Sequence, residues 1–375
     1  MSVRLLHTGD VHLGATFKVL GERGREQRRQ VQETFARVVG LALEERVDAV
    51  LIAGDLFDSP AAARVQAAFA ASQLARLEEG GIPACVIAGN HDPLGDASAS
   101  VWRDLAARCP RVKVFGPDLD AWILPERDLT VVGRAVTDRL SAESPLAGLP
   151  IPRRTRFLVA IAHGSVQRPD LPARFGLITP EEIAASGADY VALGDWHSTR
   201  AVSSGGVEAW YSGAPEMIDL DEPDSGHVCL VTVRAPGEVA VEPRRIGRRR
   251  VERLAVDVAT AGGQEGVARI ARARADADLA LVLTLTGLAG LEDRVSPHLL
   301  REDLTPEFFR LEIRDESQLR PEGIDPSQFP ENTVLGRFVR QMHAQIANRE
   351  GEARAIAEEA LAYGVALLSG KEMLG

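Results

Sequence analysis

The 375-residue sequence predicts a layered α/β sandwich, followed by a small α+β domain and a helical tail. Up to about residue 195, short apolar runs typical of strands alternate with longer helical patterns. From about residue 207 to 245 the pattern becomes β-rich, and strands that alternate with helices before such a close are typical of a sandwich. We therefore expect a main domain over residues 1–245, a capping α+β domain over 246–325 and a helical C-terminal tail over 326–375.

The main domain is predicted from apolar runs and helical patterns that follow one another along the chain. The runs that predict strands cover 3–7, 49–53, 84–88, 157–161 and 189–193. The patterns that predict helices cover about 27–46, 61–79, 98–108 and 180–186. The last of these helices begins after Thr179, a capping residue that stands before a proline in the first helical position. Further strands are expected over 208–211, 227–233 and 238–242, and these close the domain.

The remainder of the chain is predicted to contain a second, smaller core. Strands are expected over 251–258, 279–287 and 308–313, with an Ala-rich helix over 262–275. From about residue 332, apolar residues recur at helical spacing in two stretches, one before and one after Gly351. Stripes of this kind most often pack on the body of their own protein.

Composition and charge narrow the class of protein. The chain carries 54 acidic and 43 basic residues and a net charge of −11, whereas a protein that binds DNA tightly by itself is usually basic. This argues against strong autonomous DNA binding, but it is compatible with a site where metals, local arginines or a partner hold phosphates. No apolar run approaches the ~18 residues of a membrane span, so no membrane association is expected. Three scattered cysteines and a strand that begins at residue 3 favour a cytoplasmic protein without a cleavable signal.

Polar side chains follow the predicted strands at the points where most of those strands end. The motifs are Asp10-Val-His12, Gly54-Asp55-Leu-Phe-Asp58, Gly89-Asn90-His91-Asp92, Ala162-His163-Gly164 and Gly194-Asp195-Trp-His197. Because ligands of α/β proteins gather outside the carboxyl ends of the strands, we expect these five loops to converge on one site. Carboxylate and amide oxygens together with imidazole nitrogens, without thiolates, suit Mn²⁺, Fe²⁺ or Zn²⁺ better than Ca²⁺. The motifs therefore predict a site for a pair of divalent cations.

The order and context of these motifs resemble the calcineurin-like metallophosphoesterases. Within that superfamily the run Leu6-His-Thr-Gly-Asp-Val-His-Leu-Gly14 and the run Ile52-Ala-Gly-Asp-Leu-Phe-Asp58 are particularly similar to the SbcD-like nucleases of double-strand-break repair. The resemblance covers residues 3 to about 215. It implies an α/β/β/α sandwich and a two-metal phosphodiester hydrolase. The activity that it implies is a manganese-dependent DNA exonuclease, with endonuclease activity also compatible.

Carried over position by position, the resemblance also implies roles for individual residues. It makes Asp10, His12 and His197 ligands of one metal, Asp55 the bridging carboxylate, and Asn90 and His163 ligands of the second metal. His91 is expected to face the substrate and to protonate the leaving oxygen after in-line attack by a hydroxide, while the carboxylate of Asp58 orients its ring.

Position 195 departs from the pattern of the related nucleases, which usually have a metal-binding histidine there. Asp195 is expected to replace that imidazole as a metal ligand, since a carboxylate oxygen can do so. The alternative is that Asp195 forms a hydrogen bond with His197 and that the second metal site is weakened.

Other polar residues have structural interpretations beside the functional ones. His7 is expected to be a packed core histidine, and His227, His298 and His343 to be structural or surface residues. The basic cluster at the domain junction is expected either to hold a DNA backbone or to pair with Glu238, Glu242 and Glu252. The arginines of that cluster are Arg244, Arg245, Arg248, Arg249, Arg250 and Arg253.

Partners and rival functions follow from the same features. The resemblance implies that the C-terminal helices dock on the coiled coil of an SMC-like ATPase partner, and the helices 61–79 and 98–108 are compatible with a homodimer face as well as with core packing. One rival function is a phosphodiesterase or phosphatase for small substrates such as cyclic nucleotides. The other is a scaffold that has the fold but binds little or no metal.

Overall fold

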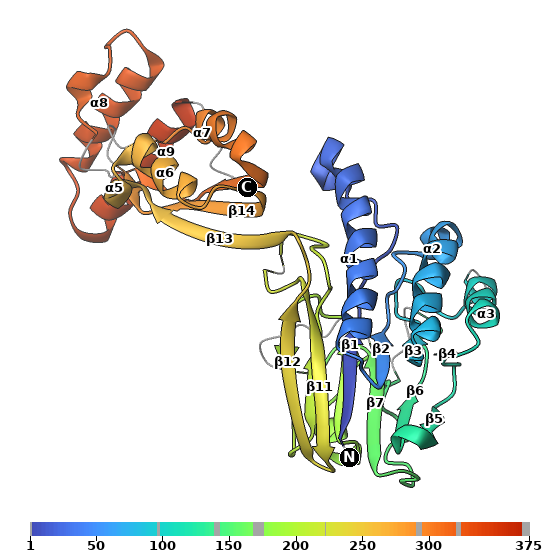
Figure 1. The fold of residues 1–375 in the computed structure, drawn as a ribbon. Coiled ribbons are helices and arrows are strands. Elements are labelled where there is room, and N and C mark those ends of the chain that lie inside the picture. Colours follow the sequence, from blue (N-terminus) through green and yellow to red (C-terminus); the bar gives the residue numbers. More distant parts are fainter. Residues whose placement is uncertain are drawn as a thin grey trace. The chain divides into compact units, whose positions relative to one another are not determined.

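The computed structural model describes residues 2–95, 98–138, 143–167, 176–221, 223–289, 295–319 and 324–369. Within it the chain divides into two compact units, residues 1–251 and residues 252–375, and each unit has its own apolar core. The predicted division of the second part into a capping domain and a tail stays a prediction. Figure 1 shows the chain coloured from the N-terminus to the C-terminus.

Two mixed sheets form the centre of the first unit. The first sheet has the strand order β12-β11-β1-β2-β3-β4 and the second has the order β5-β6-β7-β8-β10-β9. The strands of the first sheet are β1 (Val3–Thr8), β2 (Ala49–Ala53), β3 (Ala84–Ile87), β4 (Val112–Val114), β11 (His227–Ala235) and β12 (Glu238–Arg245). Those of the second are β5 (Asp120–Leu124), β6 (Leu129–Gly133), β7 (Phe157–His163), β8 (Tyr190–Gly194), β9 (Arg200–Ala201) and β10 (Glu208–Tyr211).

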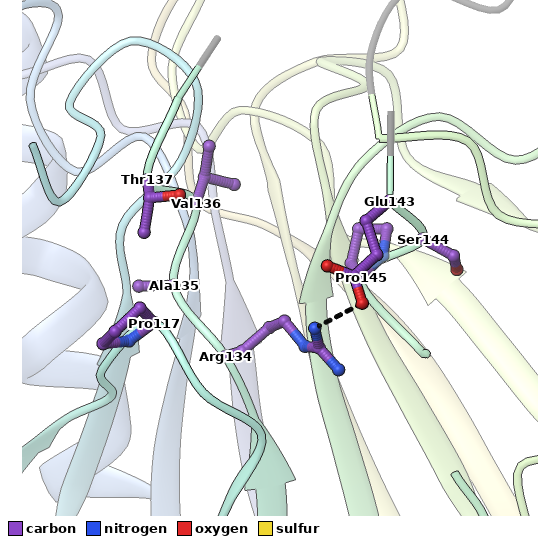
Figure 2. A pocket seen from close by; sticks show the side chains of 8 residues that line it. All are labelled: Pro117, Arg134, Ala135, Val136, Thr137, Glu143, Ser144 and Pro145. Carbon is purple, nitrogen blue, oxygen red and sulfur yellow. Dashed lines mark hydrogen bonds and ion pairs between the residues drawn. The ribbon is translucent and has the colours of Figure 1, made fainter. Parts of the chain in front are cut away.

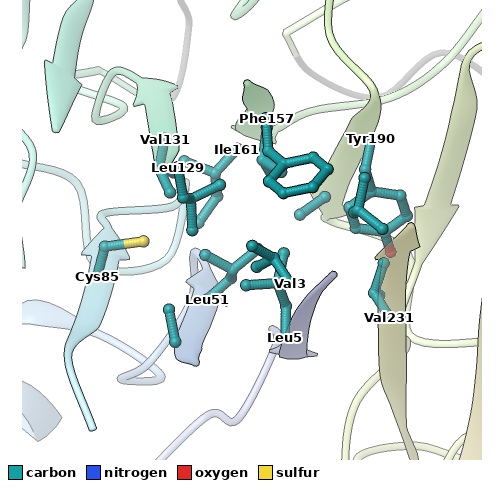
Figure 3. Close-up of a cluster of buried hydrophobic side chains, with 14 of the residues drawn as sticks. Val3, Leu5, Leu51, Cys85, Leu129, Val131, Phe157, Ile161, Tyr190 and Val231 are labelled. Carbon is teal, nitrogen blue, oxygen red and sulfur yellow. The ribbon is translucent and has the colours of Figure 1, made fainter. Parts of the chain in front are cut away.

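The main core lies between these two sheets. Alternate residues of each strand point to one face, so Leu5 and Leu51 of the first sheet share one cluster with Phe157 and Ile161 of the second. Figure 3 shows this cluster, in which side chains from both sheets interlock. The alternate residues on the outer faces, such as Leu6 and Val191, are buried too. Both faces of both sheets are therefore covered, as in the predicted α/β/β/α sandwich.

Helices supply the outer layers. The helices of this unit are α1 (Gly24–Glu44), α2 (Pro60–Glu79), α3 (Ala99–Arg108) and α4 (Pro180–Ala185), with 3₁₀ turns at Lys18–Arg23 and Pro125–Arg127. α2 packs between α1 and α3 (Figure 1), and Ile183 of α4 joins the cluster on the outer face of the second sheet. α4 begins with a capping box, in which Thr179 accepts from the backbone N–H of Glu182 at 3.1 Å and Glu182 accepts from that of Thr179 at 2.8 Å.

Parallel pairing brings the predicted motifs to one end of the sandwich. β1 pairs in parallel with β2, β2 with β3, and β7 with β8. In the second sheet His163 at the end of β7 lies opposite Gly194 at the end of β8. Because parallel strands end at the same sheet edge, the five loops leave the sandwich on one side.

His7 is a buried residue of the core, as predicted. Its Nδ1 lies 2.8 Å from the hydroxyl of Tyr190, and its Nε2 lies 3.2 Å from the carbonyl oxygen of Leu193. Burial lowers the pKa of His7 from 6.5 to about 3, although the bond to the Leu193 carbonyl opposes this change.

The buried, neutral His7 is expected to make the protein less stable in mild acid. Below a pH of about 6.5 the unfolded chain gains a proton at His7 that the folded chain does not accept until the pH approaches about 3. The free energy of unfolding is thus expected to fall by ~2 kcal/mol between pH of about 7 and about 5 through this residue alone. Urea unfolding of the native protein and of His7→Gln at both pH values measures this loss. Equal pH dependence in the two proteins would contradict it.

The second unit contains a three-stranded sheet of order β13-β14-β16 and a short parallel pair, β15 with β17. The apolar faces of α6 and α7 pack on the sheet, while α8 and α9 pack on each other around Val339 and Val365. Its strands are β13 (Arg250–Asp257), β14 (Asp276–Thr286), β15 (Leu288–Ala289), β16 (Phe308–Asp315) and β17 (Gln318–Leu319). Its helices are α5 (Val258–Ala261), α6 (Gly263–Arg272), α7 (Pro297–Leu304), α8 (Val334–Ile346) and α9 (Gly351–Leu368), with 3₁₀ turns at Thr305–Glu307 and Pro326–Gln328.

The elements that the sequence predicts are found in both units, whereas β4, β5 and β6 of the first unit and α7 of the second were not predicted. The helix expected over 27–46 begins earlier and ends earlier, at Gly24–Glu44, and the helix expected over 262–275 is shorter, at Gly263–Arg272, and follows a separate turn, α5. Among the helices of the described ranges, none has the length and apolar character that a bilayer span requires.

Candidate metal centre

Backbone hydrogen bonds hold the predicted loops against one another at the carboxyl ends of the strands. The N–H of Asp10 donates to the carbonyl of Gly54 at 3.1 Å, and the N–H of His12 donates to that of Asp55 at 3.0 Å. In the second sheet the N–H of Gly164 donates to the carbonyl of Gly194 at 3.1 Å. Loops that are far apart in the sequence are thus fixed at hydrogen-bond distance, which positions their side chains.

Glycines allow this close approach. A Cβ atom at Gly54 would overlap Nδ1 of His163, and one at Gly89 would overlap the carboxylate of Asp55. A Cβ atom at Gly194 would overlap the carbonyl of Ala53. Only glycine fits at these positions, because the functional groups of the neighbouring loops occupy the space that a side chain would need.

The backbone of the site is strained. Asp10 and His12 both have φ of 51°, Asp55 has φ of 47° and Asp195 has φ of 108°. Residues other than glycine rarely adopt this left-handed region, and such residues gather at functional sites where surrounding contacts hold them. Among the described residues, four of the seven non-glycine positions with positive φ are predicted site residues.

The first group of candidate ligands contains Asp10, His12 and His197, the set that the sequence predicts for one metal, and their ligand role stays a prediction. One ligand atom from each of these residues lies within 4.8 Å of the others, and Asp10 and His12 are buried. Nε2 of His12 lies 3.1 Å from Nε2 of His197 and 3.8 Å from Oδ2 of Asp55. The Nε2 atoms of the two rings therefore lie next to each other, and that of His12 lies near Asp55.

The second group contains Asp55 and His163, with Asp10 within reach of both, and Asn90 lies beside them. Nε2 of His163 lies 3.0 Å from Oδ1 of Asn90 and 3.4 Å from Oδ2 of Asp55. On the opposite side of the ring, Nδ1 lies 2.9 Å from the carbonyl oxygen of Ala53, which can only accept a hydrogen bond. Nδ1 therefore carries a proton, and Nε2 faces Asn90 and Asp55. Because Oδ2 of Asp55 is near both groups, Asp55 has the position of a bridging carboxylate.

The electrostatics of this pocket favour positive charge. Burial raises the pKa of Asp10 to about 7, against the opposing effect of His163 and His197. Burial would also raise the pKa of Asp55, but His163 and His12 bring it below its usual value. For His163, burial is outweighed by the Asp55 and Asp10 carboxylates, so that its pKa lies well above the usual value. The buried carboxylates of Asp55 and Asp10 thus stabilise the protonated form of the neighbouring His163.

These residues fit a pair of divalent cations. Nδ1 of His197 lies 3.2 Å from Asp219, and Nδ1 of His12 faces Asp58. If each of these Nδ1 atoms carries the proton of its neutral ring, the two Nε2 atoms have lone pairs that face each other at 3.1 Å. Two such lone pairs repel unless a cation lies beside them. The buried His12 Nδ1 itself has no hydrogen-bond partner in the part of the chain described, and the nearest carboxylate oxygen, of Asp58, is 3.6 Å away.

His91 and Asp58 meet through a contact that differs from the predicted one. Nδ1 of His91 lies 3.1 Å from the backbone carbonyl oxygen of Asp58, while the Asp58 carboxylate lies 3.6 Å from Nδ1 of His12. The backbone N–H of His91 donates to Oδ1 of Asp55 at 2.8 Å. His12, Asp58 and His91 also form a third group whose ligand atoms lie within 4.8 Å of one another. The catalytic roles of His91 and Asp58 stay predictions.

Asp92 is a site residue to which the sequence interpretation gave no role. It is fully buried and accepts from the backbone N–H of Phe57 at 2.9 Å and from that of Gly89 at 2.8 Å. Burial raises its pKa to about 8, and the Asp55 carboxylate adds to this effect. Asp92 therefore connects the loops after β2 and β3. Its place in the Asn-His-Asp motif was the signal that would have found it.

Asp195 lies beside the ligands but outside the three groups formed by the described residues. Its Oδ2 accepts from the hydroxyl of Ser165 at 2.6 Å, and its backbone N–H donates to the carboxylate of Asp10 at 3.0 Å. The carboxylate beside Nδ1 of His197 belongs to Asp219, which the sequence interpretation missed because 22 residues separate the two in the chain. The ligand role of Asp195 stays a prediction.

The arginine cluster, which runs from the end of β12 into β13, is largely used in contacts within the protein. Arg249 is 3% exposed and pairs with Glu26, and its backbone N–H donates to Glu216 at 2.8 Å. Arg244 pairs with Glu242 at 2.6 Å and with Glu45 at 3.5 Å. For these two arginines the predicted pairing with acidic residues is observed. Of the observed partners, Glu242 was predicted, whereas Glu26 and Glu45 were not.

A small cavity of about 60 Å³ opens beyond β6, lined by residues that the sequence did not single out. Figure 2 shows Arg134 beneath it, with Nη1 3.2 Å from Glu143 across the pocket. It contains none of the predicted ligands. Its volume suits one or two water molecules and is far below that of a pocket for a nucleotide.

Comparison with known proteins agrees with this geometry. A family model described as calcineurin-like phosphoesterase matches residues 3–199, which is more than half of the chain. The chain belongs to this family, and the resemblance inferred from the motifs is confirmed.

Within the family the chain is similar to the Mre11- and SbcD-like branch. It is 29% identical to the DNA double-strand break repair protein Mre11 of Haloferax volcanii, over 78% of this chain and 63% of that protein. It is 27% identical to SbcD, a component of the nuclease SbcCD of Escherichia coli K12, over 61% of this chain and 65% of that protein. It is 28% identical to the uncharacterized metallophosphoesterase YhaO of Bacillus subtilis, over 68% of this chain and 63% of that protein. The matches thus span slightly less than two thirds of these relatives.

Proposed function

We propose that this protein is a two-metal phosphodiester hydrolase that acts on DNA as a manganese-dependent exonuclease, with endonuclease activity at the same site. The observation that carries the proposal is the convergence of two ligand groups on Asp55, one through Nε2 of His12 at 3.8 Å and one through Nε2 of His163 at 3.4 Å. Support for DNA as the substrate comes from relatives whose names include DNA repair and nuclease.

The chain's own residues divide the work of such a reaction. One cation would be held by Asp10, His12 and His197, and the other by Asn90 and His163. Asp55 would bind both cations. Asp195 is proposed as a further ligand of the second cation. When bound, the cations would supply Lewis acidity and lower the pKa of a water molecule. His91 lies outside the two sets. Its Nδ1–H donates to the Asp58 carbonyl, so the doubly protonated ring would carry its second proton on Nε2 and would give that proton to the leaving oxygen.

We also propose that the protein works with a partner. The net charge of −11 and the internal pairing of Arg244 and Arg249 provide little affinity for a DNA backbone. The C-terminal helices expose large apolar side chains, among them Val334, Ile356 and Leu367, and these support docking on the coiled coil of an SMC-like ATPase partner. The Escherichia coli relative is itself named as one component of a larger nuclease. A homodimer through α2 and α3 and a cytoplasmic location complete the proposal.

One assay series tests the substrate and the metal together. The purified protein is incubated with Mn²⁺, Mg²⁺ or EDTA on end-labelled single- and double-stranded DNA and on bis-p-nitrophenyl phosphate. We expect DNA to be shortened with Mn²⁺ and to stay intact with EDTA. Hydrolysis of the small ester without loss of DNA would favour a small-substrate phosphodiesterase. No metal by elemental analysis and no hydrolysis of either substrate would favour a scaffold.

A further inference from the structure

We propose that Asp219 is a positioning residue that fixes the ring of His197 for the metal, and that Glu216 anchors the segment that carries Asp219. The inference rests on the proposed metal centre and adds to it two residues from outside the five motifs. We call residues 212–219 the anchored segment. It follows β10 and carries Glu216 and Asp219.

Asp219 decides which nitrogen of His197 faces the site. Its Oδ2 lies 3.2 Å from Nδ1 of His197, so a proton on Nδ1 is stabilised by the carboxylate. Nε2 is then left without a proton and faces Nε2 of His12 at 3.1 Å. A carboxylate that accepts from the far nitrogen of a metal-binding histidine fixes its tautomer and orientation and makes it a stronger ligand.

The anchored segment is joined to the loop of His197 at its beginning as well. The N–H of Ala214 donates to the carbonyl of His197 at 2.8 Å, and the hydroxyl of Thr199 donates to the carbonyl of Ser212 at 2.8 Å. The segment and the loop that carries the ligand therefore move together. Any displacement of the segment changes the position of the His197 imidazole.

Glu216 holds the anchored segment to the body of the first unit. Its carboxylate is buried and accepts from the hydroxyl of Thr34 in α1 at 2.6 Å and from the N–H groups of Arg248 and Arg249 at 2.9 and 2.8 Å. The adjacent carbonyl of Met217 accepts from the Gln27 side chain of α1 at 2.8 Å. A buried carboxylate with several donors is a rigid point, because removing it leaves those donors without a partner.

Binding of Mn²⁺, measured by isothermal titration calorimetry on the full chain, tests the proposal. We expect two bound ions in the native protein, and in Asp219→Ala a loss of affinity of roughly 10- to 100-fold for one of them with the other unchanged. Asp219→Glu, which keeps the carboxylate, is expected to recover part of the affinity. Because the defect lies in metal affinity, hydrolysis by Asp219→Ala is expected to approach the native kcat at saturating Mn²⁺.

Controls separate positioning from general damage. Glu238→Gln removes an exposed carboxylate that pairs with Arg234 at 3.9 Å, and it is expected to keep native Mn²⁺ affinities. Glu216→Gln is expected to weaken the same ion as Asp219→Ala and also to lower the unfolding midpoint in EDTA. If Glu216→Gln does not fold, Asp219→Ala still decides the question, because the Asp219 side chain is 42% exposed and its loss opens no core.

Two results distinguish failure of this inference from failure of the proposed function. Native affinities for both ions in Asp219→Ala, or equal weakening of both, would overturn the positioning role while the metal centre stands. Absence of bound Mn²⁺ in the native protein would overturn the metal centre itself, and the inference with it.

Discussion

Replacement of Asp55 by asparagine is expected to abolish metal-dependent phosphodiester hydrolysis. Oδ2 of Asp55 lies 3.8 Å from Nε2 of His12 and 3.4 Å from Nε2 of His163, so the side chain serves both groups of ligands. Asparagine has nearly the same shape but lacks the charge that two cations at one carboxylate require. Two-metal activation of a phosphoryl reaction is worth several kcal/mol, so we expect a loss of roughly 10³-fold or more in kcat/KM.

Metal content and rate are to be measured together for this variant. Asp55→Asn is expected to retain less than the two Mn²⁺ ions of the native protein, and His163→Ala to lose chiefly the second. Asp118→Asn, at an exposed position of the first unit, is the matched control with native rate and content. Asp195→Asn completes the set, since a lost ion there would support a ligand role for Asp195. Mn²⁺-dependent hydrolysis that survives in both Asp55→Asn and His163→Ala would refute the proposed centre.

Replacement of His91 by asparagine is expected to slow cleavage of DNA while both metals stay bound. His91 contributes its backbone N–H to Oδ1 of Asp55 at 2.8 Å, and asparagine keeps that bond. What is lost is the ring, whose Nδ1 is held 3.1 Å from the Asp58 carbonyl. A positioned general acid typically contributes about 10²- to 10⁴-fold, which is the expected loss in kcat on DNA.

The leaving group provides the control for this prediction. A p-nitrophenolate ion leaves without protonation, so His91→Asn is expected to cleave bis-p-nitrophenyl phosphate with a much smaller loss than it shows on DNA. Equal losses on the two substrates would contradict the role of acid. Loss of one Mn²⁺ ion would instead identify His91 as a ligand, in line with its place in the group with His12 and Asp58.

Much of this architecture follows from local sequence patterns. Alternating apolar residues and helix caps are properties of short segments, so strands such as β10 (Glu208–Tyr211) are predicted to the residue and α4 to within one. The predicted ligands come together for an equally simple reason. Side chains that follow parallel strands must leave the sheet at the same edge, whatever their separation in the chain.

The sequence by itself determined the sandwich, the five loops and the chemical character of the ligands, because these depend on period, order and residue type. Only the tertiary structure decided which partner each side chain has. Nε2 of His12 contacts His197, which is 185 positions away in the chain, and Glu216 contacts Thr34, which is 182 positions away. His91 contacts the backbone carbonyl of Asp58. Such contacts depend on how whole layers pack, and no local pattern encodes them. The carboxylate that orients His197 is therefore Asp219, a residue outside every motif.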